Sequence, residues 1–154
     1  MKITLVSVEK KYDSTKIITD ISYVFEEGIK YAILGGNGSG KSTLLKILSG
    51  NLSPSKGKVC YFIKKTEIDR SEIYRHIGYS APYLDLITEF DLIETATTHF
   101  RFKELSEELV IDEVPEILGL HHHSRKPLKT YSNGMLQRVK LGLALLSNCP
   151  LVFL

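Results

Sequence analysis

Long apolar runs are missing from this chain of 154 residues. A helix that crosses a bilayer needs roughly 18 or more consecutive apolar residues, and no run in the sequence reaches that length. The first residues, MKITLVSVEKKYD, are too short and too alternating in polarity for a secretory signal peptide. We therefore expect any role at a membrane to come through a partner.

The chain also has few cysteines and a small net charge. The two cysteines, Cys60 and Cys149, lie far apart and form no CxxC pair, which favours a reduced, cytoplasmic setting. The net charge of +2 is too small to argue for a nucleic-acid partner. The hydrophobic share of 43% and the charged share of 25% are typical of a soluble globular chain, and the length predicts one domain with a hydrophobic core.

The first third of the chain predicts strands followed by a helix. Residues 3–8 and 18–25 alternate apolar and polar side chains, which is typical of strands with one exposed face. These two strands are close in sequence and could form a separate antiparallel layer. Residues 31–34 form a continuous apolar run before glycines, which predicts a strand buried on both faces. Apolar residues at 44, 45, 47 and 48 then predict a helix that ends near Gly50.

The rest of the chain alternates between the two kinds of element. Residues 57–65 and 76–80 read as strands, and the character becomes helical from about Tyr83 to residue 140. Ser132 is placed to cap a helix whose apolar positions 135, 139, 143 and 146 share one face. Pro115 is expected at the start of a helix, and PLVFL at the end of the sequence reads as a buried strand. The pattern predicts an α/β fold with a largely parallel sheet, an N-terminal antiparallel β layer and a helical insertion.

A glycine-rich stretch, GGNGSGKST, lies between the predicted strand and helix. Gly35, Gly40, Lys41 and Ser42 satisfy the spacing G-x-x-x-x-G-K-[ST] of a phosphate-binding P-loop. Glycines let the backbone wrap closely around a phosphate, and its N–H groups form an anion nest. Lys41 would reach the β- and γ-phosphates of a nucleotide and serve catalysis, and the Ser42 hydroxyl would bind Mg²⁺. The expected nucleotide contacts are Gly35, Asn37, Gly38, Ser39, Gly40, Lys41, Ser42 and Thr43.

A second motif narrows the class. YSNGMLQR at 131–138 resembles the LSGGQ signature of ATP-binding cassette (ABC) proteins, with Ser132 and Gly134 matching and Gln137-Arg138 in the family's place. The order also fits: a phosphate loop first, the signature later and an apolar strand after it. The resemblance covers the whole chain and implies an ATPase subunit of a membrane transporter, with ATP and Mg²⁺ as cofactors. It also implies that Tyr12 stacks on adenine.

The resemblance also has implications for binding partners and cellular location. In the family, two cassettes sandwich two nucleotides, so Ser132 and Gly134 would complete the site of a second cassette, either identical or different. Membrane permease subunits would dock against the region 80–100, and no nucleic-acid partner is expected. The protein would then be cytoplasmic and peripheral on the inner face of the cell membrane.

The sequence departs from the family pattern at several positions. Pro82 stands where a metal-contacting Gln is usual, and Asn133 and Met135 replace the usual Gly and Gln of the signature. The resulting SxGM form resembles that of exporter ATPases, including haem-exporter-like cassettes. LVFL at 151–154 resembles the strand that precedes the family's Asp-Glu pair, so the chain is expected to be an N-terminal portion with an incomplete sheet. This portion is expected to bind ATP without hydrolysing it, whereas the full-length parent hydrolyses it.

The predicted organisation is a single truncated domain. Within it, 1–82 would form the nucleotide-binding core with its antiparallel layer, 83–140 the helical insertion, and 141–154 the end of the signature helix and the start of the next strand. Two alternatives stay open: a soluble ABC ATPase that acts on ribosomes or DNA, and a nucleotide-binding module without hydrolysis. The run His121-His122-His123 reads as a polar loop, because adjacent side chains project in different directions.

Overall fold

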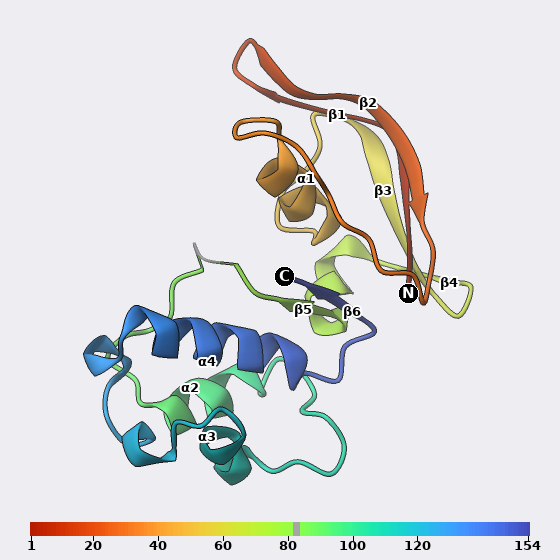
Figure 1. Ribbon diagram of the computed structural model, residues 1–154. Coiled ribbons are helices and arrows are strands. Elements are labelled where there is room, and N and C mark those ends of the chain that lie inside the picture. Colours follow the sequence, from red (N-terminus) through yellow and green to blue (C-terminus); the bar gives the residue numbers. More distant parts are fainter. Residues whose placement is uncertain (82–83) are drawn as a thin grey trace. The chain divides into compact units, whose positions relative to one another are not determined.

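The computed structural model describes residues 1–81 and 84–154, which divide into two compact units, Met1–Tyr74 and Arg75–Leu154 (Figure 1). The interpretation of Pro82 falls outside the described residues. Within those residues, no helix combines the length and apolar character that crossing a membrane would require.

The first unit is built on a four-stranded antiparallel sheet with the order β2-β1-β3-β4. The predicted antiparallel layer of the first two strands is therefore confirmed. Both strands are longer than the sequence pattern indicated. The bounds are β1 Lys2–Tyr12, β2 Thr15–Phe25, β3 Lys56–Ile63 and β4 Thr66–Ile68.

One face of β1 is buried although its apolar residues are not evenly spaced. Ile3, Leu5 and Val8 are all buried, yet the step from Leu5 to Val8 is three residues rather than two. The pairing register shifts between these two positions, and Ser7 has a φ of 44°. A β-bulge of this kind adds one residue and so returns Val8 to the face that carries Ile3 and Leu5.

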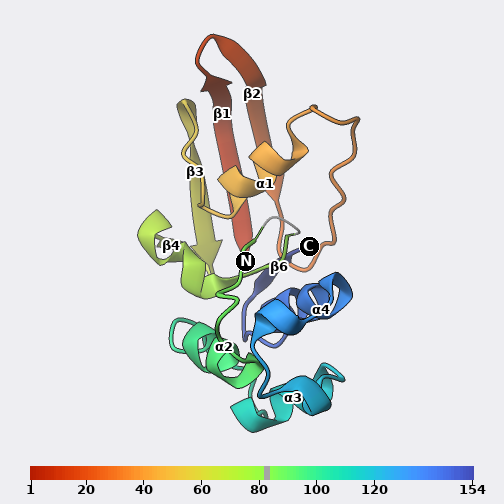
Figure 2. The same cartoon turned by 90° about the vertical axis from the view of Figure 1, so that its left-hand side faces the viewer.

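Helix α1 (Lys41–Leu48) lies beside the sheet of the first unit (Figure 2). Its last two residues, Ile47 and Leu48, are buried. The hydroxyl of Tyr61 on β3 donates a hydrogen bond of 3.0 Å to the carbonyl of Ile47. This contact satisfies one of the carbonyl groups that the end of a helix leaves without an intrahelical partner.

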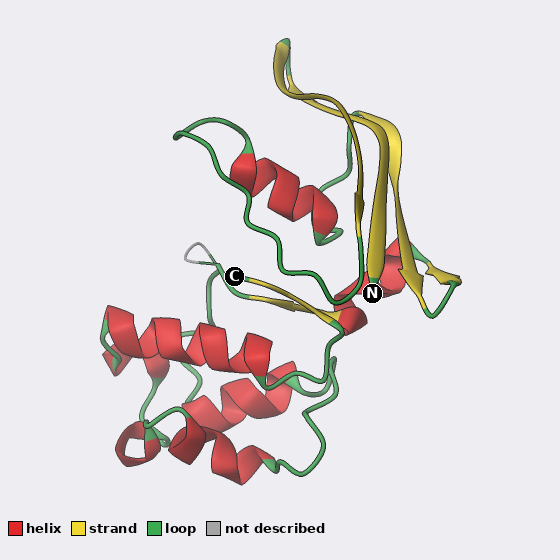
Figure 3. Cartoon of the chain, turned by 45° about the vertical axis from the view of Figure 1, so that its right-hand side comes forward, coloured by secondary structure: helices red, strands yellow, loops and turns green. Residues whose placement is uncertain are grey.

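The predicted buried strand at residues 31–34 is wrong. The segment between β2 and α1 is drawn as an irregular loop in Figure 3, and Leu34 is 88% exposed. A strand exists only through pairing with a neighbour, and no described strand pairs with this segment. The segment is instead fixed near Tyr31, whose hydroxyl accepts a hydrogen bond of 2.9 Å from the Glu26 N–H and whose ring lies edge-on to Phe25.

The second unit contains a parallel pair of strands, β5 (Ile77–Tyr79) and β6 (Leu151–Phe153). Both were predicted as strands, and β6 was predicted from its apolar run. Helix α4 (Asn133–Leu145) packs beside β5, and a Cβ added at Gly78 would lie 2.4 Å from the Ala144 carbonyl oxygen. Only glycine allows this approach of helix backbone to strand backbone.

The remaining elements of the second unit are helical. They are α2 (Leu92–His99), α3 (Val114–Ile117) and the 3-10 turns Ile111–Glu113, His121–His123 and Leu128–Thr130. A further 3-10 turn, Arg70–His76, spans the residues at which the two units divide, and Pro115 lies in the first turn of α3 as expected. The core residues of this unit are Leu92, Ala96, Val114, Leu120, Leu128, Tyr131, Val139 and Leu143.

His99, at the end of α2, is held in a poorly solvated position. Its Nε2 lies 3.1 Å from the Ser147 hydroxyl, which itself donates to the Leu143 carbonyl. The pKa of His99 is lowered from 6.5 to about 4, chiefly by desolvation and also by the nearby ammonium group of Lys103. His99 is therefore neutral near pH 7.

We expect this histidine to make the stability of the chain depend on pH. The unfolded chain binds a proton at His99 below pH 6.5 and the folded chain only below about 4, so the free energy of unfolding should rise between these values and level off above them. The predicted contribution is about 2–3 kcal/mol. His99→Gln should remove this part of the dependence in urea unfolding measured from pH 4 to 7. The exposed His122→Gln is the control, and an unchanged slope in His99→Gln would contradict the assignment.

Candidate nucleotide-binding site

The start of α1 has the features of an anion-binding site. Gly40 is the N-cap with a φ of 91°, and within the described part of the chain no side chain caps this end or places a carboxylate in the first turn. The first N–H groups of a helix lack intrahelical partners, and the helix dipole makes this end positive. A phosphate group satisfies both conditions.

The side chain of Lys41 folds back over the loop. Its Nζ donates hydrogen bonds of 2.9 Å to the Gly35 carbonyl and 2.7 Å to the Gly36 carbonyl. An ammonium group has three N–H donors, so one remains for a ligand. The two carbonyl contacts hold the ammonium group of Lys41 against the loop that leads into α1.

Gly35, Gly38 and Gly40 are favoured by the geometry of the loop. Gly38 has a φ of 78°, in the left-handed region, and a Cβ there would meet open space. At Gly35, a Cβ would lie 2.6 Å from the Ser39 hydroxyl oxygen, and at Gly40 it would lie 3.1 Å from Cγ2 of Ile17. The loop therefore closes tightly at both ends and leaves its tip, including Asn37, exposed.

Ser42 follows Lys41 in the first turn of α1 and is exposed. Its hydroxyl oxygen suits a hard cation such as Mg²⁺, which commonly takes one or two protein ligands together with phosphate oxygens and water. Within the described residues, no cluster of three or more His, Cys, Asp or Glu side chains offers a complete metal site. Thr43 is the next residue of the helix and is partly buried.

Tyr12 lies in the same unit as the phosphate loop. It ends β1, pairs with Thr15 on β2 and is 47% exposed. Gly40 of the loop lies close to Ile17 and Ile18 on β2. Three residues along a strand cover about 10 Å, so Tyr12 and the loop are separated by a distance of the order of that between the base and the phosphates of a nucleotide.

The signature-like motif lies in the second unit. Ser132 is the N-cap of α4, and its Oγ accepts a hydrogen bond of 3.3 Å from the Met135 N–H. The predicted cap is therefore confirmed. Ser132, Asn133 and Gly134 are all exposed, and the nearest neighbour to an added Cβ at Gly134 would be the Ser132 Oγ at 4.0 Å. The start of α4 is open to a ligand or partner.

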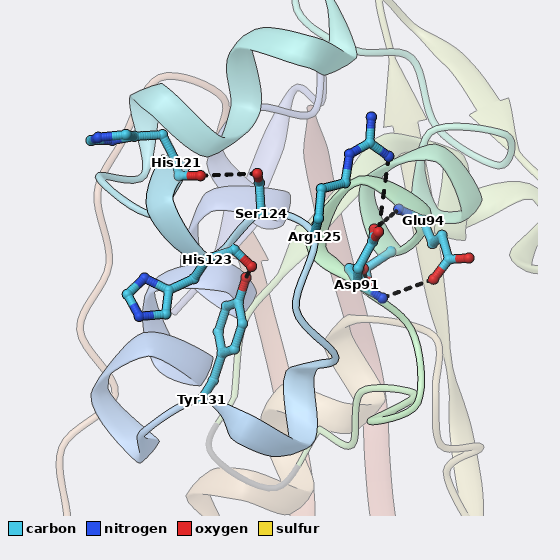
Figure 4. Close-up of polar contacts among 8 residues, drawn as sticks. Asp91, Glu94, His121, His123, Ser124, Arg125 and Tyr131 are labelled. Atoms are coloured by element: carbon cyan, nitrogen blue, oxygen red, sulfur yellow. Dashed lines mark hydrogen bonds and ion pairs between the residues drawn. The ribbon is translucent and has the colours of Figure 1, made fainter.

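Tyr131, the residue that precedes this cap, is itself held in place by a hydrogen bond that sequence reasoning missed. Figure 4 shows its hydroxyl donating to the His123 carbonyl, at 2.8 Å, while the ring is buried in the helical core. His121–His123 forms a 3-10 turn, as the polar-loop interpretation allowed, and Ser124 closes it by donating 2.9 Å to the His121 carbonyl. The sequence signal for this contact was the position of an aromatic residue, Tyr131, directly before the capping serine.

The turn before α2 is fixed by side chains as well. The carboxylate of Asp91 accepts from the Glu94 N–H, and the carboxylate of Glu94 accepts from the Asp91 N–H, both at 2.8 Å (Figure 4). Arg125 pairs with Asp91 at 3.9 Å. The Leu92 N–H also donates to the Ser124 carbonyl. The segment before the signature-like motif is thereby tied to the start of α2.

A glycine-rich loop that runs into an uncapped helix and holds a lysine over its carbonyls defines a P-loop nucleotide-binding domain. Comparison with known proteins gives the family. The ABC transporter family matches residues 18–154, and the chain belongs to this family.

Two curated relatives illustrate the similarity. The spermidine/putrescine import ATP-binding protein PotA of Fusobacterium nucleatum is 30% identical over 148 residues, which cover 94% of this chain and 39% of the relative. The bacitracin transport ATP-binding protein BcrA of Bacillus licheniformis is 30% identical over 145 residues, which cover 94% of this chain and 47% of the relative. The chain thus spans less than half the length of these two relatives.

Solved structures share the fold. An ATP-binding subunit of an ABC transporter has a TM-score of 0.82 at 24% identity, covering 99% of this chain and 65% of its own. A dimeric ATP-binding cassette in a post-hydrolysis state, bound to ADP and Pi, has a TM-score of 0.79 at 23% identity, covering 97% of this chain and 72% of its own. The predicted α/β fold class with an antiparallel layer and a helical region is confirmed.

Loss of the cap should destabilise α4. We expect Ser132→Ala to lower the free energy of unfolding of the chain by about 1 kcal/mol, because the Met135 N–H loses its acceptor. Urea unfolding followed by circular dichroism measures the loss. Ser132→Asp should retain most of the stability, since Asp is also a good N-cap. If Ser132→Ala and Asn133→Ala cost the same, the hydroxyl contributes nothing as a cap.

Proposed function

We propose that this chain forms the ATP-binding part of the ATPase subunit of an ABC membrane transporter. The observation that carries the proposal is the Lys41 ammonium group, held by the Gly35 and Gly36 carbonyls at the uncapped start of α1. This arrangement places positive charge and free N–H donors together, which suits the terminal phosphates of a nucleotide. The domain boundaries proposed at 82/83 and 140/141 stay predictions.

Each predicted contact has a role in this proposal. The backbone N–H groups from Gly35 to Thr43 bind phosphate oxygens, and Lys41 neutralises their charge. The hydroxyl of Ser42 fits Mg²⁺, which would hold the phosphates in one orientation and neutralise developing charge in phosphoryl transfer. The exposed ring of Tyr12 stacks on the adenine base.

The exposed start of α4 suits a second cassette. We propose that Ser132 and Gly134 contact the nucleotide of a partner cassette, because both residues are exposed at the start of a helix, where a phosphate can be bound. The dimeric state of the similar cassette bound to ADP and Pi supports this arrangement. Homodimer and heterodimer are both compatible with an exposed motif.

Permease subunits and a position at the cytoplasmic face of the membrane complete the proposal. The names of the similar proteins include a polyamine importer and a bacitracin transporter, so similarity at this level fixes neither the cargo nor the direction of transport. We propose that the membrane subunits determine both. The family match supports the transporter over a soluble ATPase of ribosomes or DNA, and hydrolysis is proposed for the complete protein.

The central test removes the lysine. Lys41→Ala should weaken ATP binding at least tenfold, because hydrogen bonds from a charged donor contribute about 1.5–3 kcal/mol. Isothermal titration calorimetry measures the affinity, and circular dichroism checks the fold. Lys58→Ala, an exposed lysine on β3, is the charge-matched control. Unchanged ATP affinity in a folded Lys41→Ala chain would refute the phosphate assignment.

A second test addresses the base. Tyr12→Ala should weaken ATP binding about tenfold or more, because stacking on a base contributes about 1–3 kcal/mol. Binding of inorganic triphosphate should stay nearly unchanged, since it has no base. Tyr12→Phe should keep the ATP affinity. Equal losses for ATP and triphosphate would show that Tyr12 supports the fold of the hairpin and does not contact adenine.

A further inference from the structure

The ring of Tyr12 has a cation on one face. The Nζ of Lys10 lies 5.2 Å from the centroid of the ring, within the distance at which an ammonium group is attracted to an aromatic face. The two residues are two positions apart on β1, so their side chains project to the same side of the strand. The sequence motif KKY contains this pair, and strand alternation places Lys10 rather than Lys11 on the side of Tyr12.

The ammonium group of Lys10 is also held from the other side. It donates a hydrogen bond of 2.9 Å to the Ser53 carbonyl, which lies in the loop between α1 and β3. A lysine side chain loses considerable rotamer freedom when it is fixed, and the two contacts together define where its charge lies. Lys10 therefore occupies one face of the Tyr12 ring.

The end of β1 is bound to the same loop through the main chain. The Ser55 N–H donates 2.7 Å to the Glu9 carbonyl, and the Lys11 N–H donates 3.0 Å to the Ser55 hydroxyl. These bonds flank Lys10 in sequence. The strand that ends in Tyr12 is thus fixed to residues 53–55 both by backbone contacts and by the Lys10 ammonium group.

This loop is fixed in turn to the end of the phosphate-loop helix. Arg70 donates to the Gly50 carbonyl from Nε at 3.2 Å and from Nη2 at 2.7 Å, and its Nη1 donates to the Ser53 hydroxyl. The Leu52 N–H donates 2.9 Å to the Lys46 carbonyl. The carbonyl that binds Lys10 therefore belongs to a segment that continues directly from α1.

From these contacts we propose that Lys10 is a positioning residue for the nucleotide base. Its ammonium group covers one face of the Tyr12 ring, holds the plane of the ring relative to α1, and leaves the opposite face for adenine. The inference rests on the proposed stacking of adenine on Tyr12. It adds that the base binds on one defined face and that a residue without contact to the nucleotide sets its affinity.

The test separates this role from a structural one by using two ligands. Lys10→Met keeps most of the apolar stem and removes the charge, and it should weaken ATP binding about two- to fivefold, the range expected for an exposed cation–π contact. Binding of inorganic triphosphate should not change. Lys10→Arg should keep the ATP affinity because guanidinium also binds aromatic faces. Lys11→Met is the matched control for lost charge and should bind ATP like the unchanged chain.

A double-variant comparison by calorimetry decides whether Lys10 acts through Tyr12. In a Tyr12→Ala chain, adding Lys10→Met should cause no further loss of ATP affinity. A further loss in that background, or equal losses for ATP and triphosphate in Lys10→Met alone, would overturn the inference while leaving the proposed function intact. Absence of ATP binding by the unchanged chain would overturn the proposed function, and this inference with it.

Discussion

The hydrogen bond from the Tyr61 hydroxyl to the Ile47 carbonyl fixes one end of the helix on which nucleotide binding depends. Burial raises the pKa of Tyr61 to about 12, so the hydroxyl stays protonated and remains a donor at any physiological pH. At the other end of α1, Gly40 packs against Ile17 of β2. The antiparallel sheet thus determines where the phosphate loop lies, and with it the direction of the free N–H groups at the start of the helix.

The two helix starts proposed to recognise nucleotides lie in separate units. Neither α1 nor α4 has a carboxylate in its first turn. The two helices differ in their N-caps. Gly40 leaves the start of α1 without a side-chain cap, whereas the Ser132 hydroxyl caps α4. The first arrangement suits direct and charged phosphate binding. The second supplies a hydroxyl at a surface that a partner cassette can reach.

Local sequence was sufficient to predict the glycine-rich loop before α1 and the Ser132 cap, because both depend on contacts between residues at most six positions apart. It was misleading for residues 31–34, where an apolar run has no described strand to pair with. It also gave no sign of the contact between Lys10 and the Ser53 carbonyl, because 43 positions separate the two residues. The low pKa of His99 likewise arises from its burial beside Ser147 and from the nearby charge of Lys103, a combination that no single segment encodes.

The first unit is proposed to bind a whole nucleotide, with the phosphates at α1 and the base at Tyr12. Calorimetric titration of the unchanged chain with ATP and, separately, with inorganic triphosphate, both with Mg²⁺, measures this directly. We expect saturable binding of a single ATP per chain and weaker binding of triphosphate at the same loop. Absence of saturable ATP binding, or equal affinity for the two ligands, would show that the first unit does not recognise a whole nucleotide in this way.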